Sequence, residues 1–294
     1  MDRIADAMER ARGNAVPAGA FRSNRATHPR EDAGAGNGVP GSIKYTRTRT
    51  LEVDRKMLRE RRIVGGLESG TRTDAYKILC TQVLQRLRDN GWNALAVTSA
   101  RGGEGKTLTA INLAISLARE VDQTVLLVDA DLRSPNVHRC FGLPEASGLS
   151  DFLIGNVALE QILVHPGIEH LVILPGGRPL LNSSEMLGSQ KMMTLVQELK
   201  GRYPSRIVVF DLPPVLSAAD SLAFSPYVDA AILVVEEGAT DRDDLQRAAE
   251  MLSSTRLIGT VLNKSREAEK TDPVQVQDNG GWLGRILRRS RPED

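Results

Sequence analysis

The sequence predicts an α/β protein with a doubly wound, mostly parallel sheet. From residue 73 onward, short apolar runs alternate with segments of helical periodicity, which is typical of strands joined by crossover helices. The runs are apolar throughout rather than at every second residue, which indicates a sheet covered on both faces. The composition is that of an ordinary globular protein, with 294 residues, 41% hydrophobic, 26% charged and 4% aromatic. In such folds, ligands bind beyond the carboxyl ends of the strands.

The first predicted element of the folded part is a helix that starts near Thr73. Its apolar residues recur at i, i+3, i+4 and i+7, and Asn90-Gly91 ends it (Tyr76, Leu79, Cys80, Val83, Leu84, Leu87). The predicted strands are Ala94–Thr98, Thr124–Asp129, Leu171–Leu174, Ile207–Asp211, Ala230–Val235 and Ile258–Asn263. Helical patterns lie between them, for example Thr107–Arg119, Gln190–Arg202 and Asp243–Ser253.

The two ends of the chain differ from this pattern and divide it into three parts. Residues 1–72 are expected to be a mostly disordered leader, because Gly13–Pro40 is rich in Gly, Ala, Asn and Pro. Met1–Arg12 has the spacing of a short amphipathic helix, which is either a docking peptide or a frayed terminus. The folded domain covers residues 73–264. Residues 265–294 are expected to be a flexible, basic, amphipathic tail.

The tail and the charge distribution limit the kinds of partner. In the tail, Trp282, Leu283, Ile286 and Leu287 share one helical face among arginines, as in segments that contact anionic membranes or a partner's groove; a solvated end is the alternative. The leader holds 15 Lys and Arg against 9 Asp and Glu, whereas residues 73–263 hold 16 against 22. Such an acidic body does not favour nucleic-acid binding.

The length of the apolar runs, the first residues and the cysteines favour a cytoplasmic protein. The apolar runs are far shorter than the roughly 20 residues that cross a bilayer, and the first residues do not form a secretory signal. Cys80 and Cys140 lie far apart without metal-ligand spacing, so we expect both to be buried thiols. We therefore predict a cytoplasmic protein with weak contact to the inner membrane through its termini.

A glycine-rich loop between a strand and a helix predicts a phosphate-binding site. Residues 94–108 read ALAVTSARGGEGKTL, so an apolar strand leads into the loop and Lys106-Thr107 opens a helix. The glycines let successive backbone N–H groups face one anion, the lysine adds a positive charge, and the threonine hydroxyl can bind Mg²⁺. Ala100 stands where the strict pattern has glycine, and an incidental glycine turn is the alternative. The candidate nucleotide-binding residues here are Arg101, Gly102, Gly103, Glu104, Gly105, Lys106, Thr107 and Leu108.

Acidic residues follow two further predicted strands. Residues 125–133 read VLLVDADLR, with Asp129 at the strand end and Asp131 just beyond it. Residues 206–214 read RIVVFDLPP, with Asp211 at the strand end. Acids at strand ends beside a phosphate loop can hold Mg²⁺ or accept a proton from a nucleophile. Each aspartate alone could equally be a turn or capping residue, but the three features together favour a phosphoryl-transfer site.

These three motifs resemble the bacterial tyrosine kinases (BY-kinases), which are P-loop proteins. The resemblance covers Thr73–Lys264 and is greatest to the tyrosine autokinases of exopolysaccharide loci linked to exosortase systems. It implies the P-loop NTPase fold and a Mg-ATP-dependent protein-tyrosine kinase that regulates exopolysaccharide synthesis and export. It also implies an inner-membrane polysaccharide chain-length (co-polymerase) protein as partner, and a homo-oligomer.

The resemblance also implies roles for the motif residues. Lys106 and Thr107 would bind the phosphates and Mg²⁺, and Asp211 would hold the metal shell. Asp129 and Asp131 match the paired acids of the family, one of which would activate the tyrosine hydroxyl. The implied catalytic residues are Lys106, Asp129, Asp131 and Asp211, and the implied metal ligands are Thr107, Asp129 and Asp211.

Two more residues have implied nucleotide contacts. Arg133, in DADLR, would neutralise developing charge or pair with a neighbouring acid. Asn263, in GTVLNK, occupies the position at which related P-loop ATPases contact adenine.

The sequence departs from related families at three places. Septum- and chromosome-positioning ATPases have a signature lysine where this chain has Arg101. The E-x-x-R-x-x-R helix that builds BY-kinase rings is replaced by Asp74, Lys77 and Cys80, so a ring is expected to be weaker or absent. The family's C-terminal tyrosine cluster is missing from residues 228–294.

The position of the tyrosines leaves two functional alternatives open. Tyr76, Tyr203 and Tyr227 lie in the predicted domain and are expected to pack there, which leaves Tyr45 or a separate protein as phosphate acceptor. An ATPase switch without kinase activity, or a module that binds nucleotide only for structure, are the alternatives.

Overall fold

The computed structural model describes residues 49–65, 70–120, 123–155, 157–201 and 205–265. Within these residues the chain forms an eight-stranded sheet with the order β1-β4-β5-β3-β6-β2-β7-β8. Neighbouring strands are parallel except for the short antiparallel β4–β5 pair. The strands are β1 (Arg49–Thr50), β2 (Ala94–Ser99), β3 (Thr124–Asp129), β4 (Val164–His165), β5 (Leu171–Leu174), β6 (Arg206–Asp211), β7 (Ala230–Glu236) and β8 (Arg256–Asn263).

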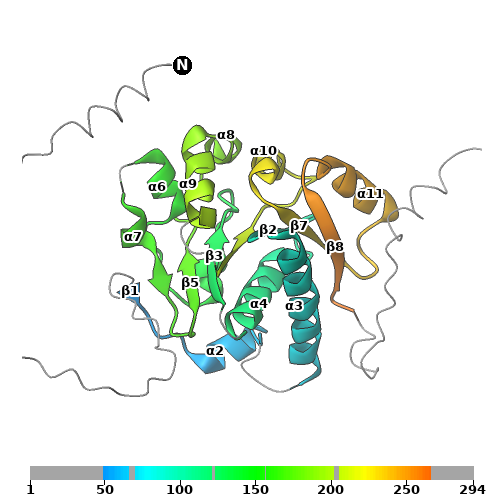
Figure 1. Ribbon diagram of the computed structural model, residues 1–294, viewed down its shortest axis with the longest axis horizontal. Coiled ribbons are helices and arrows are strands. Elements are labelled where there is room, and N and C mark those ends of the chain that lie inside the picture. Colours follow the sequence, from blue (N-terminus) through cyan, green and yellow to red (C-terminus); the bar gives the residue numbers. More distant parts are fainter. Residues whose placement is uncertain (1–48, 66–69, 121–122, 156, 202–204, 266–294) are drawn as a thin grey trace, which may run out of the picture. The chain divides into compact units, whose positions relative to one another are not determined.

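Helices cover both faces of this sheet, as Figure 1 shows. Along β2, Leu95 and Val97 join the core formed with α3 and α4, whereas Ala94 and Ala96 join the opposite core formed with α9. The helices are α2 (Arg55–Glu60), α3 (Thr71–Asn90), α4 (Lys106–Ala118), α5 (Val137–Cys140), α6 (Leu149–Ile154), α7 (Leu159–Ile162), α8 (Ser183–Leu187), α9 (Gln190–Gly201), α10 (Asp220–Phe224), the 3-10 turn η1 (Ser225–Tyr227) and α11 (Arg242–Met251). The doubly wound, mostly parallel sheet predicted from uniformly apolar strands is therefore confirmed.

The six predicted strands are present, with ends shifted by at most two residues. The first predicted helix is α3, which begins at Thr71, buries Cys80 and Leu87 from its apolar stripe, and ends before Gly91. Gly91 has φ 66°, the left-handed conformation that favours glycine after a helix. The two-residue strands β1 and β4 were not predicted, because so short a segment has no recognisable periodicity.

The folded part begins earlier than residue 73, the predicted boundary. In the segment before α3, Leu58 and Ile63 are each only 1% exposed and belong to the core beneath α4. The side-chain oxygen of Asn112 in α4 accepts hydrogen bonds from the backbone N–H groups of Val64 and Gly65, at 2.7 and 2.8 Å. Residues 49–65 therefore belong to the folded body and not to a disordered leader.

Other predictions about the ends lie outside the described residues. These are the amphipathic pattern of Met1–Arg12, the leader 13–40, and the tail with its apolar face at Trp282. Within the described residues, no helix is both long enough and apolar enough to cross a bilayer.

Replacing Leu58 with alanine tests whether the segment before α3 stabilises the domain. We expect Leu58→Ala to lower the free energy of unfolding by about 2–4 kcal/mol, because it leaves a cavity in the core. Urea denaturation followed by circular dichroism measures this, with exposed Glu60→Ala on the same helix as control. Equal stability of the two variants would show that the segment does not contribute to the domain core.

Candidate active site

The sheet brings the three sequence motifs to one edge. β3, β6 and β2 are neighbours in that order, and their carboxyl ends carry Asp129, Asp211 and Ser99 respectively. In the register of the parallel ladder, Asp129 lies directly beside Asp211, and Val97 lies on the other side of Asp211. The acids therefore meet the glycine-rich loop that follows β2, as expected for parallel strands.

The glycine-rich loop is held in place by its own glutamate. Glu104 is buried, and its carboxylate accepts hydrogen bonds from the backbone N–H of Arg101, at 2.8 Å, and from the hydroxyl of Thr240. The side-chain amide of Asn263, at the end of β8, donates to the carbonyl oxygen of Glu104 at 2.8 Å. Gly105 has φ 94° and immediately precedes α4, so its backbone turns into the helix in a conformation that only glycine adopts readily. These bonds fix the loop before any ligand binds.

Lys106 is the positive centre of the site. Its ammonium group lies 2.7 Å from Asp131 Oδ2 and 3.5 Å from Asp211 Oδ1, and its side chain is 12% exposed. The adjacent Thr107 hydroxyl donates to Asp211 Oδ2 at 2.7 Å. Burial opposes the charge on the lysine, but Asp211 and Asp131 outweigh it, so the pKa of Lys106 is raised. The structure thus brings together four of the predicted residues.

Asp129 is a buried acid with a raised pKa and one oxygen without a hydrogen bond among the described residues. Its Oδ2 accepts two backbone hydrogen bonds of 2.9 Å, from Asn136 and Val137 at the start of α5, whereas its buried Oδ1 has no hydrogen-bond partner among the described residues. Burial and then the neighbouring Asp211 raise the pKa of Asp129 to about 8. Burial also raises the pKa of Asp211, although Lys106 and Thr107 oppose this. Asp129 can therefore hold or release a proton near neutral pH.

The oxygen ligands at this edge suit Mg²⁺ with a bound nucleotide. No group of three His, Cys, Asp or Glu side chains within the described residues is arranged to hold a metal ion alone. Mg²⁺ ordinarily uses one or two protein oxygens together with waters and substrate phosphates, so a full protein cage is not required. The Thr107 hydroxyl and Asp211 Oδ1, which accepts no hydrogen bond among the described residues, are oxygens of the required kind.

Four other predicted residues do not contact this acidic cluster. Arg101 pairs through Nε with buried Asp244 of α11, and Asn263 binds the loop backbone. Arg133 pairs through Nε with buried Asp220 at 3.0 Å. Leu108 is half-buried against the core beneath α4. The sequence did not single out Asp220 or Asp244, because an acid in SAADSL or in DRDD looks like a solvated residue.

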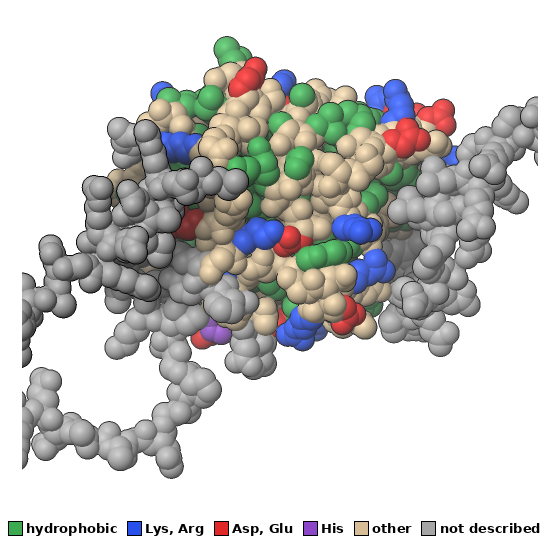
Figure 2. Space-filling view, turned by 45° about the horizontal axis from the view of Figure 1, so that its top comes forward, with side chains coloured by type: hydrophobic (Ala, Val, Ile, Leu, Met, Phe, Trp, Pro, Cys, Tyr) green, Lys and Arg blue, Asp and Glu red, His purple; other side chains and the backbone are tan. Residues whose placement is uncertain are grey.

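The surface around the site has no single dominant charge. In Figure 2, which turns the top of Figure 1 forward, the described basic and acidic side chains are scattered among apolar and neutral ones. A cavity of about 650 Å³ beside the loop is lined by Arg101, Leu216, Ser217, Arg247, Glu250 and Met251.

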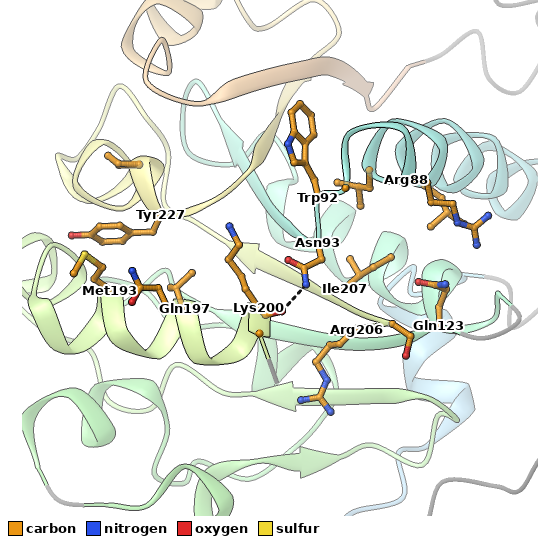
Figure 3. Close-up of a pocket in the computed structure, with 17 residues that line it drawn as sticks. Arg88, Trp92, Asn93, Gln123, Met193, Gln197, Lys200, Arg206, Ile207 and Tyr227 are labelled. Atoms are coloured by element: carbon orange, nitrogen blue, oxygen red, sulfur yellow. Dashed lines mark hydrogen bonds between the residues drawn. The ribbon is translucent and has the colours of Figure 1, made fainter. Parts of the chain in front are cut away.

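A second cavity, of about 910 Å³, lies at the opposite end of the sheet (Figure 3). It is lined by residues just before β2 and at the start of β6, among them Trp92 and Arg206. Two of its lining residues are joined by a 2.8 Å hydrogen bond from the Asn93 side chain to the carbonyl oxygen of Lys200. It is separate from the phosphate-binding loop.

Alanine substitutions at two loop glycines test the loop geometry. A Cβ on Gly105 would collide with the Asn263 amide at an unfavourable φ, so Gly105→Ala should lower the stability of the ligand-free protein by about 1–3 kcal/mol. A Cβ on Gly102 would meet open space, so Gly102→Ala should leave stability unchanged. Thermal unfolding of both variants measures this, and equal melting temperatures would contradict the described loop.

The raised pKa of Asp129 predicts how stability depends on pH. Its pKa rises from an ordinary 3.8 to about 8 on folding, so the folded protein retains a proton that the unfolded chain has lost. The free energy of unfolding should therefore fall as the pH rises between these values. Asp129→Asn removes this penalty, and its stability relative to wild type should increase between pH 5 and 8.5 by about 1 kcal/mol or more. Urea titrations in EDTA measure it, and exposed Asp89→Asn should show no such trend.

Several known proteins are similar to this chain in sequence and in fold. A family model described as an AAA domain matches residues 93–256. Tyrosine-protein kinase YwqD of Bacillus subtilis is 32% identical over 202 residues, which cover 68% of this chain and 84% of YwqD. The VpsO kinase domain is 32% identical with a TM-score of 0.60, covering 66% of this chain and 96% of that domain. The chimerical protein CapA2B2 is 26% identical with a TM-score of 0.65, covering 74% and 93%. With the glycine-rich loop and the two acidic strand ends in their expected places, this chain belongs to the bacterial tyrosine kinases, a family of P-loop proteins.

Proposed function

We propose that the protein is a Mg-ATP-dependent protein-tyrosine kinase that regulates exopolysaccharide synthesis and export. The observation that carries the proposal is the buried contact of Lys106 with Asp131 and Asp211 beside Asp129, at the edge where the glycine-rich loop begins a helix. This arrangement supplies a cation for the triphosphate and an acid with a raised pKa for the acceptor. Relatives in Bacillus and Streptococcus carry the name tyrosine-protein kinase, which supports the same reaction.

Binding and charge neutralisation are the main tasks of the loop. Its backbone N–H groups and Lys106 would hold the β- and γ-phosphates, and the ammonium group of Lys106 has donors enough to keep its contact with Asp131. Thr107 and Asp211 would hold Mg²⁺, which neutralises charge on the phosphates when bound. The chain's own contribution is the Lys106 ammonium group and the loop N–H groups, held in place beside the acids in surroundings largely screened from water.

Asp129 is the better candidate for the proton acceptor of the two paired acids. Both oxygens of Asp131 are engaged, one by Lys106 and the other by the backbone N–H of Ser134 at 3.1 Å. Asp129 keeps one oxygen without a partner among the described residues, and its pKa of about 8 is near the value that suits a general base at neutral pH. Asp129 would therefore take the proton of the tyrosine hydroxyl as the phosphoryl group is transferred.

The acceptor is either Tyr45 or a tyrosine of another protein. Tyr76 is half-buried on α3, and burial raises the pKa of its hydroxyl. The Tyr227 hydroxyl donates to the carbonyl oxygen of Gly188 at 3.1 Å. Tyr45 and Tyr203 lie outside the described residues. Two of the four tyrosines are thus engaged in packing.

The partner and the state of association are part of the same proposal. The family resemblance supports an inner-membrane chain-length protein as the partner, with contact through the termini. On α3, Lys77 and Asp74 form an exposed ion pair of 3.0 Å and Cys80 is buried. The two charged side chains therefore bind each other within one chain, which supports a weaker ring than in relatives with the full motif.

Replacing Lys106 tests the kinase activity directly. Lys106→Ala should reduce phosphotyrosine formation from radiolabelled Mg-ATP by at least about 100-fold, because the transferred phosphoryl group loses its main positive contact. Exposed Lys56→Ala serves as the control. Mass spectrometry then locates the phosphate, which we expect on Tyr45 or on an added partner protein. ATP hydrolysis without phosphotyrosine would favour the ATPase switch, and phosphate only on Tyr76 or Tyr227 would contradict the proposed acceptor.

A further inference from the structure

An exposed arginine beside the site is held by a buried acid that no motif includes. Arg133, in the loop after β3, contacts Asp220 Oδ2 through Nε at 3.0 Å. The Asp220 side chain is 0% exposed, whereas that of Arg133 is 46% exposed. A carboxylate is costly to bury, and this one has no hydrogen bond to its second oxygen among the described residues. Such a cost is typical of a functional position.

Asp220 is rigidly connected to the loop that follows Asp211. It is the first residue of α10, and the next residue, Ser221, donates its hydroxyl to the carbonyl oxygen of Pro213 at 2.6 Å. The same oxygen accepts a bond from the Thr98 hydroxyl of β2 at 2.7 Å. The position of Asp220 is therefore fixed relative to both the acid of β6 and the strand that leads into the phosphate-binding loop.

Arg133 belongs to the same turn as the acid that contacts Lys106. The backbone N–H of Ser134 bonds to both the carbonyl and the Oδ1 of Asp131, at 3.1 Å each, which closes the turn around Arg133. Two peptide units separate Arg133 from Asp131, so their Cα atoms are within about 7.6 Å, and an arginine side chain can span this distance. Nε donates to Asp220, whereas Nη1 and Nη2 of Arg133 donate no hydrogen bond within the described residues, and Glu185 of α8 lies close enough to interact with the charge of Arg133.

We propose that Asp220 is a positioning residue that holds Arg133 so that Nη1 and Nη2 neutralise the oxygens of the phosphoryl group during transfer. The inference rests on the proposed phosphoryl transfer. In that step the bond between the γ-phosphorus and its bridging oxygen breaks, and a bond to the acceptor oxygen forms. The proton of the acceptor hydroxyl goes to Asp129 Oδ1, and Arg133 stays protonated throughout. A guanidinium held at one nitrogen loses less freedom when its other two bind an anion.

The alternative is that the ion pair only joins α10 to the loop after β3. A structural role predicts a loss of stability without a selective effect on the transferring phosphoryl group. Aluminium fluoride bound with Mg-ADP mimics the phosphoryl group in the transition state. The two roles are separated by one ratio, the affinity for Mg-ADP with aluminium fluoride divided by the affinity for Mg-ADP alone. This ratio does not depend on which acceptor the protein uses.

The experiment measures this affinity ratio by calorimetry in the full chain. For Asp220→Asn and Arg133→Lys, we expect Mg-ADP affinity within about twofold of wild type and affinity for the aluminium fluoride complex reduced at least about 10-fold. Arg133→Lys keeps a positive charge beside Asp220, so it should fold even if Asp220→Asn is unstable. Asp229→Asn, which removes an acid paired with Lys200 at the other end of the sheet, should leave the ratio unchanged.

A double variant tests whether Asp220 acts through Arg133. Arg133→Ala should lower the ratio at least as much as Asp220→Asn, and adding Asp220→Asn to Arg133→Ala should not lower it further. The added change should instead raise the melting temperature, because it removes an unpaired buried carboxylate. An unchanged ratio in Asp220→Asn and Arg133→Lys, or additive losses in the double variant, would overturn the inference.

The results also separate this inference from the proposed function. If wild type forms no phosphotyrosine but the affinity ratio falls in Asp220→Asn and Arg133→Lys, the proposed tyrosine acceptor is wrong and the role of Asp220 stands. If wild type forms phosphotyrosine and the ratio is unchanged, only the role of Asp220 is wrong.

Discussion

The site depends on the attraction between Lys106 and the carboxylates gathered around it. Asp131 and Asp211 lie within 2.7 and 3.5 Å of its ammonium group, and Asp129 occupies the ladder position beside Asp211. Three acids with so little exposure repel one another and lose their hydration. Burial, and then the neighbouring Asp211, raise the pKa of Asp129, and the single lysine does not offset them. This edge therefore favours a further positive charge, such as the Mg²⁺ that we propose accompanies the nucleotide.

Buried hydrogen bonds keep this strained arrangement in place. Asp129 is anchored by two backbone N–H groups at the start of α5, and Asp211 by the Thr107 hydroxyl. The loop itself is fixed by Glu104, whose carboxylate and carbonyl connect it to residues after β7 and at the end of β8. When the polar groups of a site are already oriented, little reorganisation is needed as charge develops in the transition state.

The same principle extends to three exposed arginines, which are held by two buried acids. Asp220 holds Arg133, and Asp244 holds both Arg101 and Arg247. In each case the acid is almost completely buried on a helix that follows one of the sheet strands, and the guanidinium group extends into solvent. Burying an acid against an arginine fixes the direction of a long side chain that would otherwise sample many rotamers. The helices that cover the sheet thus also orient charges around the nucleotide site.

The sequence by itself determined the sheet, its two covered faces and the edge that carries the site. Uniformly apolar runs such as Val125–Val128 permit only strands buried on both faces, and the glycine-rich loop and Asp211 have local patterns that are readable without a structure. The tertiary structure decided what depends on contacts between distant residues. The core role of Leu58, the arginine partners Asp220 and Asp244, and the different hydrogen-bond partners of Asp129 and Asp131 all follow from such contacts. An acid's burial and neighbours are set by the packing of segments far apart in the chain, and residue spacing does not encode them.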